Sequence, residues 1–391
     1  MRSVEVFAGC GGLALGIAEA GFKHELVIER DPLAAATLSA NKRRRIRHVA
    51  DWPIHQEDIR NACFRSLAGG IDLLSGGPPC QPFSIGGKHE GPRDARNMWP
   101  EAIRAVRELR PRAFLFENVR GLLRPAFERY LDFLRLQLSW PTSRAKLGES
   151  WPSKLVRFRA WEASGRKPTY RVIIKGINAA DYGAPQKRHR AIFIGVRSDL
   201  VDDAFIFPKA THSREALIWS QWVTGEYWDL HEIPKRRRPG LDDSEKIILE
   251  RLRADNVKPR GKRWTTVRDA IGDLPRPCIH NEPIANHRLH PGARVYRNHT
   301  GSVWDQPAKA LKAGDHGVPG GENILIPENG IVRYFTLREM ARLQGLPDAF
   351  RVGNGWAGPI KQLGNAVPVH VGRTFACEIA KVIKRAKRRD Q

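Results

Sequence analysis

Residues 76–84 read GGPPCQPFS and directly follow the apolar run Ile-Asp-Leu-Leu at 71–74. A strand that enters Gly-Gly-Pro-Pro has to end there, because proline lacks an amide donor and biases the residue before it away from helix. Cys80 is therefore expected on a stiff loop at the carboxyl end of a strand, which is where ligands collect in open α/β sheets. A free cysteine on such a turn can equally be a packing residue, so its role depends on the rest of the chain.

Short apolar strands alternate with amphipathic helices through residues 1–198. This alternation predicts a parallel sheet covered by helices. Residues 139–168 form an insertion without a motif that can be assigned. Two later strands, at 170–174 and 191–196, are expected as an antiparallel addition to the sheet. The other expected strands are 4–7, 25–28, 71–74 and 113–116, and the expected helices are about 12–20, 32–40, 98–109 and 127–138.

The composition changes between residues 199 and 335, where prolines, histidines, tryptophans and glycines occur without a clear period. Only 243–254 is expected to be a helix there. At residue 336 an ordered pattern returns, because Thr336 and Glu339 have the spacing of a capping box at a helix start. The sequence thus predicts a first domain of 1–198 plus 336–391 and a second, smaller domain of 199–335.

The formal net charge of the 391 residues is +24, which calls for a polyanionic partner. Residues 1–198 carry 34 Lys and Arg against 19 Asp and Glu, and 336–391 carry 11 against 4. The middle segment is nearly balanced, with 21 against 19. The excess therefore lies in the outer segments, and nucleic acid is the leading partner.

The five cysteines show no paired spacing suited to zinc, and no metal site is expected. The chain begins in a strand-like run rather than in a charged leader, and it contains no apolar run long enough to cross a bilayer. These features lead us to expect a cytoplasmic protein that does not associate with membranes.

A glycine-rich stretch, FAGCGG at 7–12, follows the first strand and opens the first helix. Glycines there let backbone amides approach a ligand closely at the positive end of a helix. The spacing fits the dinucleotide motif GxGxxG poorly. Glu29 ends the second strand, where an acidic residue can bind both ribose hydroxyls, and Asp58 could accept from an adenine amino group. Although isolated acidic residues at such places are usually helix caps, these indicate an adenosine-containing cofactor.

Two further motifs carry candidate catalytic groups. Glu117 follows the strand at 113–116, near Cys80 if the two strands are neighbours, although a helix cap is the alternative. Arg188 and Arg190 alternate in QKRHR, so an extended segment would turn both to one face, suited to a phosphate or to an oxygen that gains negative charge. A solvated strand edge would explain the two arginines equally well.

Taken together, these motifs resemble the DNA (cytosine-5) methyltransferase family, the S-adenosylmethionine-dependent enzymes of bacterial restriction-modification systems and their relatives. The resemblance covers both ends of the chain and leaves 199–335 unmatched, as expected for the family's variable target-recognition domain. Leu346 stands where the family often has Phe. The motifs occur in family order: FAGCGG, Glu29, Asp58, GGPPCQPFS, ENV at 117–119, QKRHR at 186–190, REMARLQGLP at 338–347 and GNAVP at 364–368.

The resemblance implies a Rossmann-like α/β methyltransferase sheet and a catalytic set of Cys80, Glu117, Arg188 and Arg190. Cys80 would attack C6 of a cytosine flipped out of the duplex, so that C5 can accept the methyl group. Glu117 would relieve charge at N3 and Arg188 at O2. In the middle segment, Arg294, Arg297, Asn298 and Thr300 are candidates for reading bases. The implied cofactor-binding residues are Phe7, Gly9, Gly11, Glu29, Asp58, Ile59, Pro78 and Asn365.

The implied partner is double-stranded DNA, which a monomer would bind across a cleft between the two domains, and a restriction endonuclease acting separately is possible. Three other interpretations remain open. A tRNA cytosine-5 methyltransferase would share the motifs. A dinucleotide-dependent oxidoreductase conflicts with the glycine spacing and the Pro-Pro-Cys loop. A non-catalytic partner of another methyltransferase would be expected to lack Cys80, Glu117 or Arg188, and all three are present.

Overall fold

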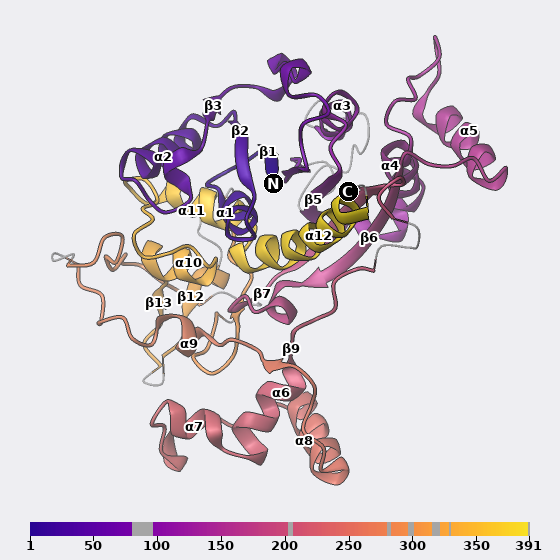
Figure 1. Cartoon of the computed structure of the whole chain (residues 1–391). Helices are drawn as coiled ribbons and strands as arrows, with labels where there is room; N and C mark the ends of the chain where they lie inside the picture. The colour runs from indigo at the N-terminus through magenta and orange to yellow at the C-terminus, as the bar shows by residue number, and fades with distance from the viewer. Residues whose placement is uncertain are drawn as a thin grey trace.

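The computed structural model describes residues 1–79, 97–201, 206–279, 283–295, 301–314, 321–327 and 330–389. Its centre is a seven-stranded sheet (Figure 1). The strands are β1 (Arg2–Val6), β2 (Lys23–Glu29), β3 (Ile54–Gln56), β4 (Leu73–Gly76), β5 (Ala113–Val119), β6 (Tyr170–Asn178) and β8 (His189–Arg197). Across the sheet they follow the order β3-β2-β1-β4-β5-β8-β6.

Five of these strands, β3, β2, β1, β4 and β5, run parallel, and β8 runs antiparallel to both of its neighbours, β5 and β6. The expected parallel sheet with an antiparallel addition is therefore confirmed. Strand β3 was not expected, because it has only three residues and two of them are exposed, so no apolar pattern marks it.

Helices cover both faces of the sheet. Phe114 and Phe116 point to the face covered by α3 and α4, whereas Leu115 between them points to α1 and α12. Both faces of β5 are thus buried along its apolar residues 113–116, as expected for a strand inside a helix-covered sheet. The helices around the sheet are α1 (Gly12–Glu19), α2 (Pro32–Arg43), α3 (Trp99–Leu109), α4 (Glu128–Ser139), α5 (Trp151–Ala163) and α12 (Val369–Arg389).

Small residues let the last helix of the chain pack closely on the first. A Cβ added to Gly12 would stand 2.3 Å from the carbonyl oxygen of Val367, and one added to Gly16 would stand 2.3 Å from that of Val369. Because no side chain fits in that space, α1 and the start of α12 touch backbone to backbone. The C-terminal segment therefore belongs to the same packed unit as the glycine-rich loop before α1.

The remaining elements are short. The expected capping box of Thr336 and Glu339 is present at the start of α10, and α8 is the helix expected at 243–254. The helices are α6 (Arg214–Ile218), α7 (Glu226–Leu230), α8 (Asp243–Asp255), α9 (Val267–Ile271), α10 (Leu337–Leu343) and α11 (Ala357–Asn365). The two-residue strands are β7 (Gln186–Lys187), β9 (His212–Ser213), β10 (Lys262–Arg263), β11 (Ala308–Lys309), β12 (Ile324–Leu325) and β13 (Arg333–Tyr334).

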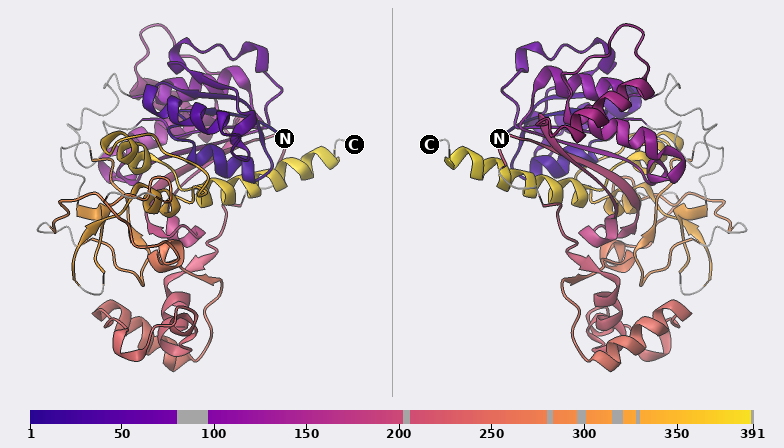
Figure 2. Two further views of the ribbon diagram at one scale, coloured as in Figure 1. Left: turned by 90° about the vertical axis from the view of Figure 1, so that its left-hand side faces the viewer. Right: turned by 90° about the vertical axis from the view of Figure 1, so that its right-hand side faces the viewer.

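The segment 199–335 does not pack as one body. Helices α6, α7 and α8 lie away from the sheet (Figures 1 and 2) and build two small clusters around Trp228 and Leu249. By contrast, Val267, Leu311 and Phe335 share a cluster with residues of α1 and α2. The hydrophobic clusters thus join the second half of this segment to the sheet unit.

No helix within the described residues is long and apolar enough to span a membrane. In the same part of the chain, no group of three or more His, Cys, Asp or Glu side chains is arranged to hold a metal ion.

Candidate active site

The carboxyl edge of the sheet gathers most of the residues singled out in the sequence. Parallel strands end at the same edge, so the loops after β1, β2, β4 and β5 meet there. The antiparallel β8 begins at this edge, where Arg190 is paired in register with Val119 of β5. Segments far apart in the sequence are thereby brought to one place.

The glycine-rich loop is tied to Glu29. The backbone amide of Gly9 donates to Glu29 Oε2 at 2.7 Å, and that of Asp31 donates to Oε1 at 2.6 Å. Phe7, Gly9 and Gly11 all have positive φ angles, of 56°, 55° and 87°. The carboxylate therefore fixes a sharply turned loop after β1 to the loop after β2.

The surface above this loop is open. Among the described residues, no heavy atom lies within 4 Å of the place where a Gly9 Cβ would stand. Among the described residues each oxygen of Glu29 accepts from one backbone amide, which leaves a second lone pair for a hydroxyl group. The Gly9 backbone, the start of α1 and Glu29 thus fit the ribose and the amino-acid part of a nucleoside cofactor.

Asp58 and Ile59 lie just after β3, next to the Glu29 loop. Asp58 accepts from Arg60 Nη2 at 2.6 Å and from Arg30 Nη1 at 3.3 Å. The hydrogen bonds from Arg60 hold the pKa of this carboxyl well below its usual range. Ile59 is buried. The structure therefore places an ionised acid beside Glu29, held by arginines whose side chains are more than half exposed.

The loop after β4 leads directly to Cys80, which lies outside the described residues. Pro78 is buried and Pro79 is exposed. The side-chain amide of Asn118 donates to the carbonyl oxygen of Pro78 at 3.1 Å. The end of β5 thus anchors the loop that carries the cysteine, a role of Asn118 that the sequence reasoning missed although the residue is part of the ENV motif.

Glu117 and Arg190 form an ion pair across the β5–β8 pairing. Arg190 Nε lies 2.5 Å from Glu117 Oε1, and their side chains are 16% and 10% exposed. Arg190 Nη1 also donates to the carbonyl oxygen of His189, at 2.8 Å. Glu117 lies against the Pro loop as well, since a Cβ on Gly77 would stand 3.5 Å from Glu117 Oε2. A carboxylate and a guanidinium are therefore held together beside the loop that leads to Cys80.

Arg188 has different surroundings. Its side chain is fully buried, and it donates through Nη1 to the carbonyl oxygen of Leu311 at 3.0 Å and through Nη2 to that of Gly364 at 2.6 Å. Burial lowers the pKa of this guanidinium well below its usual range, and the nearby charge of Arg190 acts in the same direction. Both terminal nitrogens of Arg188 thus hold two distant loops together.

A buried pair of glutamines adds to this link. Gln186 Nε2 donates to Gln344 Oε1 at 3.1 Å and to the carbonyl oxygen of Leu343 at 3.0 Å. The QKRHR and REMARLQGLP motifs are therefore joined inside the protein. Each motif contains a glutamine, but nothing in the sequence indicated that Gln186 and Gln344 contact each other.

Five further positions expected from the sequence add little to the geometry of the site. Asn365 is the last residue of α11 and is exposed, one residue after the Gly364 carbonyl group that Arg188 binds. Arg294 is exposed. Arg297, Asn298 and Thr300 lie outside the described residues.

Comparison with known proteins identifies the family. The C-5 cytosine-specific DNA methylase family matches residues 1–139 and 159–381. The type II methyltransferase M.PspPI of Psychrobacter sp. is 31% identical over 98% of this chain and 80% of its own length. M.NgoMIV of Neisseria gonorrhoeae is 30% identical, with 98% of each chain covered.

Solved structures agree on the fold. A Spodoptera frugiperda DNMT2 variant has a TM-score of 0.56 at 14% identity, with 98% of this chain and 99% of that chain covered. The S. pombe Dnmt2 methyltransferase has a TM-score of 0.53 at 16% identity, again with 98% and 99% covered. With the family match spanning nearly the whole sequence and the motif residues gathered at one edge of the sheet, this chain belongs to the C-5 cytosine-specific DNA methylases.

Proposed function

We propose that this S-adenosylmethionine-dependent DNA (cytosine-5) methyltransferase modifies one cytosine within a specific sequence of double-stranded DNA, through a covalent bond between Cys80 and the flipped base. The observation that carries the proposal is the Glu117–Arg190 ion pair beside the loop that leads to Cys80. This arrangement brings a carboxylate, a guanidinium and the loop that leads to the proposed nucleophile to one edge of the sheet. The type II methyltransferases at 30–31% identity support a place in a restriction-modification system.

Carbon C5 of cytosine is too poor a nucleophile to take the methyl group directly. A nucleophile of the enzyme therefore has to activate it by adding to the neighbouring C6. The Cys80 thiolate forms a bond to C6, and the electron pair of the C5–C6 double bond makes C5 nucleophilic. S-Adenosylmethionine supplies the methyl group from its sulfonium. A base then removes the C5 proton, and the electrons of the C5–H bond restore the double bond as the Cys80–C6 bond breaks. The thiolate is thereby regenerated and no oxidant or reductant is needed.

Addition at C6 pushes negative charge onto N3 and O2 of the ring. We assign the hydrogen bond at N3 to Glu117 and the contact to O2 to Arg190 rather than to Arg188. The support is geometric, since both terminal nitrogens of Arg188 already donate to backbone carbonyl groups, whereas Arg190 is partly exposed and pairs with Glu117. Arg188 then acts as a positioning residue for the loops around Leu311 and Gly364.

The cofactor would be held by the glycine-rich loop, Glu29 and Asp58, with Phe7, Ile59, Pro78 and Asn365 around it. The open surface at Gly9 and the free lone pairs of Glu29 support this assignment. Glu29 also fixes the loop itself, so it orients the backbone amides as well as the ribose hydroxyls.

Replacement of Glu29 tests the cofactor site. Glu29→Ala removes a charged hydrogen-bond acceptor from the ribose and releases the Gly9 loop, so we expect S-adenosylhomocysteine to bind roughly 10- to 100-fold more weakly. Isothermal titration calorimetry on the purified protein would measure this. Glu57→Ala serves as the control and should bind normally, because Glu57 lies next to Glu29 but its side chain makes no hydrogen bond to another described residue. Equal losses in the two variants would contradict the assignment.

The target base has to leave the duplex, because C6 is stacked inside it, at a cost of a few kcal/mol. We propose that lysines and arginines of the sheet unit hold phosphates near the carboxyl edge while the segment 199–335 reads bases. The separate clusters of α6, α7 and α8 support an independently variable reading unit. DNA would lie between this unit and the sheet.

Sequencing of methylated cytosines tests the function as a whole. In a bacterial host without other cytosine-5 methylation, expression of this chain is expected to place 5-methylcytosine at one short sequence throughout the genome. The same host expressing the Cys80→Ser variant is the matched control and should stay unmodified. Methylation of tRNA without any methylation of DNA would instead identify a tRNA cytosine-5 methyltransferase and overturn the proposal.

A further inference from the structure

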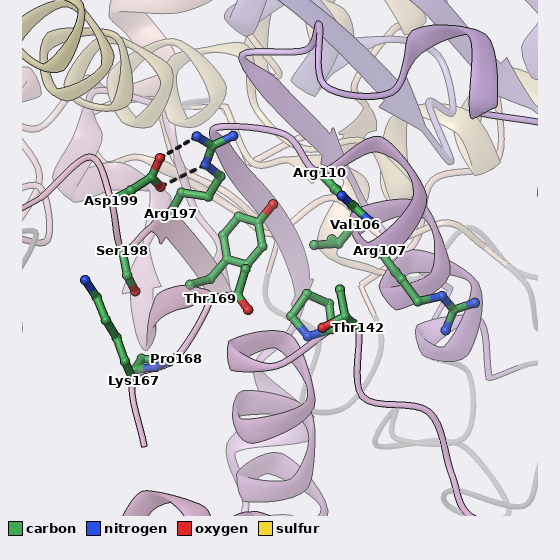
Figure 3. Close-up of a pocket in the computed structure, with 12 residues that line it drawn as sticks. Val106, Arg107, Arg110, Thr142, Lys167, Pro168, Thr169, Arg197, Ser198 and Asp199 are labelled. Carbon is green, nitrogen blue, oxygen red and sulfur yellow. Dashed lines mark hydrogen bonds and ion pairs between the residues drawn. The ribbon is translucent and has the colours of Figure 1, made fainter. Parts of the chain in front are cut away.

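Two adjacent cavities lie at the amino edge of the sheet, opposite the active site. The first, of about 490 Å³, lies where α3 ends, β6 begins and β8 ends (Figure 3). In Figure 3, Arg107 and Arg110 stand on one side of it and Lys167 and Arg197 on the other. The second cavity, of about 460 Å³, is lined by Arg65 and Arg144 and shares Arg107 and Arg110 with the first. The two cavities therefore form one continuous basic surface.

Most of its cations have no acidic partner. Arg197 is bonded to Asp199 and Glu108 to Arg104, which accounts for the two carboxylates of the lining. Within the described ranges, no carboxylate pairs with the five remaining cations, which are Arg65, Arg107, Arg110, Arg144 and Lys167. Five unpaired cations around two adjoining cavities repel one another, and an anionic ligand would remove that cost.

An insertion provides part of this surface. The C-5 cytosine-specific DNA methylase match leaves out residues 140–158, and the insertion 139–168 contributes Arg144 and Lys167 to the lining. Between residues 140 and 168 there are seven Lys and Arg against two Glu. The segment is firmly packed, because Trp140 and Phe158 are buried against α4. Lys154 is also buried there, which lowers its pKa to about 8. Part of the basic surface is thus carried by an ordered segment, of which the family match omits residues 140–158.

The DNA at the active site cannot easily reach this surface. The cavities lie beside Ala113 at the start of β5, whereas Glu117 and Val119 mark its other end. At about 3.3 Å per residue the two edges are roughly 20 Å apart along the strand, which is a distance comparable to the width of a duplex. A straight duplex whose cytosine is in the active site would therefore leave the amino edge free.

The residues that line the two cavities also indicate whether the surface suits single-stranded or double-stranded nucleic acid. Tyr170 is the one aromatic residue of either lining; it is 1% exposed and its hydroxyl group donates to the carbonyl oxygen of Pro111 at 2.7 Å. Binding of single strands relies largely on exposed aromatic rings that stack on bases, whereas a duplex backbone is bound mainly through neutralisation of its phosphates by Lys and Arg. We propose that this surface binds the phosphate backbone of a second segment of double-stranded DNA, without reading its sequence.

A stoichiometry measurement tests the proposal without relying on catalysis. The probe is a duplex of about 16 base pairs made only of A·T pairs, which contains no cytosine to methylate. By sedimentation at about 50 mM salt, the wild-type chain is expected to bind two duplexes. A fourfold variant is expected to bind only one duplex. It carries Arg65→Gln, Arg107→Gln, Arg110→Gln and Lys167→Gln. Affinity falls as salt rises, and each phosphate contact contributes about 0.9 to the steepness of log affinity against log salt. For the second binding step of the wild type, this slope should have a magnitude of about 3 to 4.

The matched control removes the same charge elsewhere. Four exposed arginines lie at and just after the end of α2, namely Arg43, Arg44, Arg45 and Arg47. Helix α2 packs beside β3, which is the edge strand opposite to β6 in the sheet. Replacement of all four by Gln is expected to leave two duplexes bound. A smaller variant, Arg65→Gln with Lys167→Gln, should weaken the second step at least fivefold and guards against misfolding of the fourfold variant. On a short duplex that contains the target site, turnover by the fourfold test variant and by the twofold variant should stay within about twofold of wild type.

Four results would overturn the proposal. The wild-type chain could bind only one A·T duplex, or the fourfold variant could still bind two. The control variant could lose the second duplex as readily as the test variant. Binding of poly-glutamate by wild type but not by the fourfold variant, in place of the duplex, would assign the surface to an acidic protein. None of these readouts depends on methyl transfer, so they remain valid if the proposed catalytic function fails.

Discussion

Replacement of Cys80 by serine is expected to reduce methyl transfer to DNA by on the order of 10⁴-fold or more, leaving no measurable turnover. A serine hydroxyl group is far less acidic than a thiol and is not ionised at neutral pH, so attack at C6 would lack its nucleophile. The cofactor residues around Glu29 are untouched, so S-adenosylhomocysteine should bind within about twofold of wild type. Single-turnover transfer of a labelled methyl group and calorimetry would measure the two effects separately.

A trapping experiment identifies the nucleophile directly. DNA with 5-fluorocytosine at the target cannot lose its C5 substituent as a proton, so the covalent adduct should persist and map to the peptide that contains Cys80. Cys10 provides the matched control within the same site. Burial raises the pKa of the Cys10 thiol to about 12, and its Sγ contacts the carbonyl oxygen of Gln362 at 3.7 Å. Cys10→Ala should therefore form the adduct normally.

Four outcomes would contradict the mechanism. Full activity of the Cys80→Ser protein would show that no thiolate at this position takes part. An adduct on Cys10, or normal turnover of the fluorinated DNA without any adduct, would place the nucleophile elsewhere or remove the covalent step. Loss of cofactor binding together with activity would show that the Pro loop serves the cofactor rather than the base.

Much of the sheet could be predicted because its strands carry strong local signals. Residues 113–116 in β5 and 191–196 in β8 consist of apolar residues and glycine, and the glycine and proline residues after β1 and β4 end those strands sharply. Glu29 could be assigned to the glycine-rich loop because parallel strands end at one edge. The structure adds that the link is direct, through the amide of Gly9.

The roles of the two arginines could not be separated in the same way. In an isolated extended segment, Arg188 and Arg190 would share a face and have similar surroundings. In the structure, Arg188 lies between β7 and β8, and its partners, Leu311 and Gly364, are 123 and 176 residues further along the chain. Such long-range contacts leave no local pattern, so burial of one arginine and exposure of the other appear only in the folded chain.

The same substitution at these two arginines is therefore expected to give opposite results. Arg190→Lys keeps a positive charge next to Glu117, so the fold should be retained, but a single ammonium group cannot contact both Glu117 and an oxygen of the base as a guanidinium can. Because removal of one donor to a developing negative charge typically costs 10²- to 10³-fold in turnover, we expect a loss of about that size. Thermal unfolding should shift little, and S-adenosylhomocysteine should bind as in wild type.

Arg188→Lys should instead weaken the fold. One ammonium group cannot replace two hydrogen bonds that point to the carbonyl groups of Leu311 and Gly364, and a buried carbonyl group left without a donor costs about 1–3 kcal/mol. We expect a lower melting temperature and a smaller loss of turnover at temperatures where the variant is folded. If Arg188→Lys were fully stable yet inactive while Arg190→Lys remained active, Arg188 would be the residue at O2. The loops at 311 and 364 would then have to be held by other contacts, which makes the melting temperature the measurement that distinguishes a positioning residue from a catalytic one.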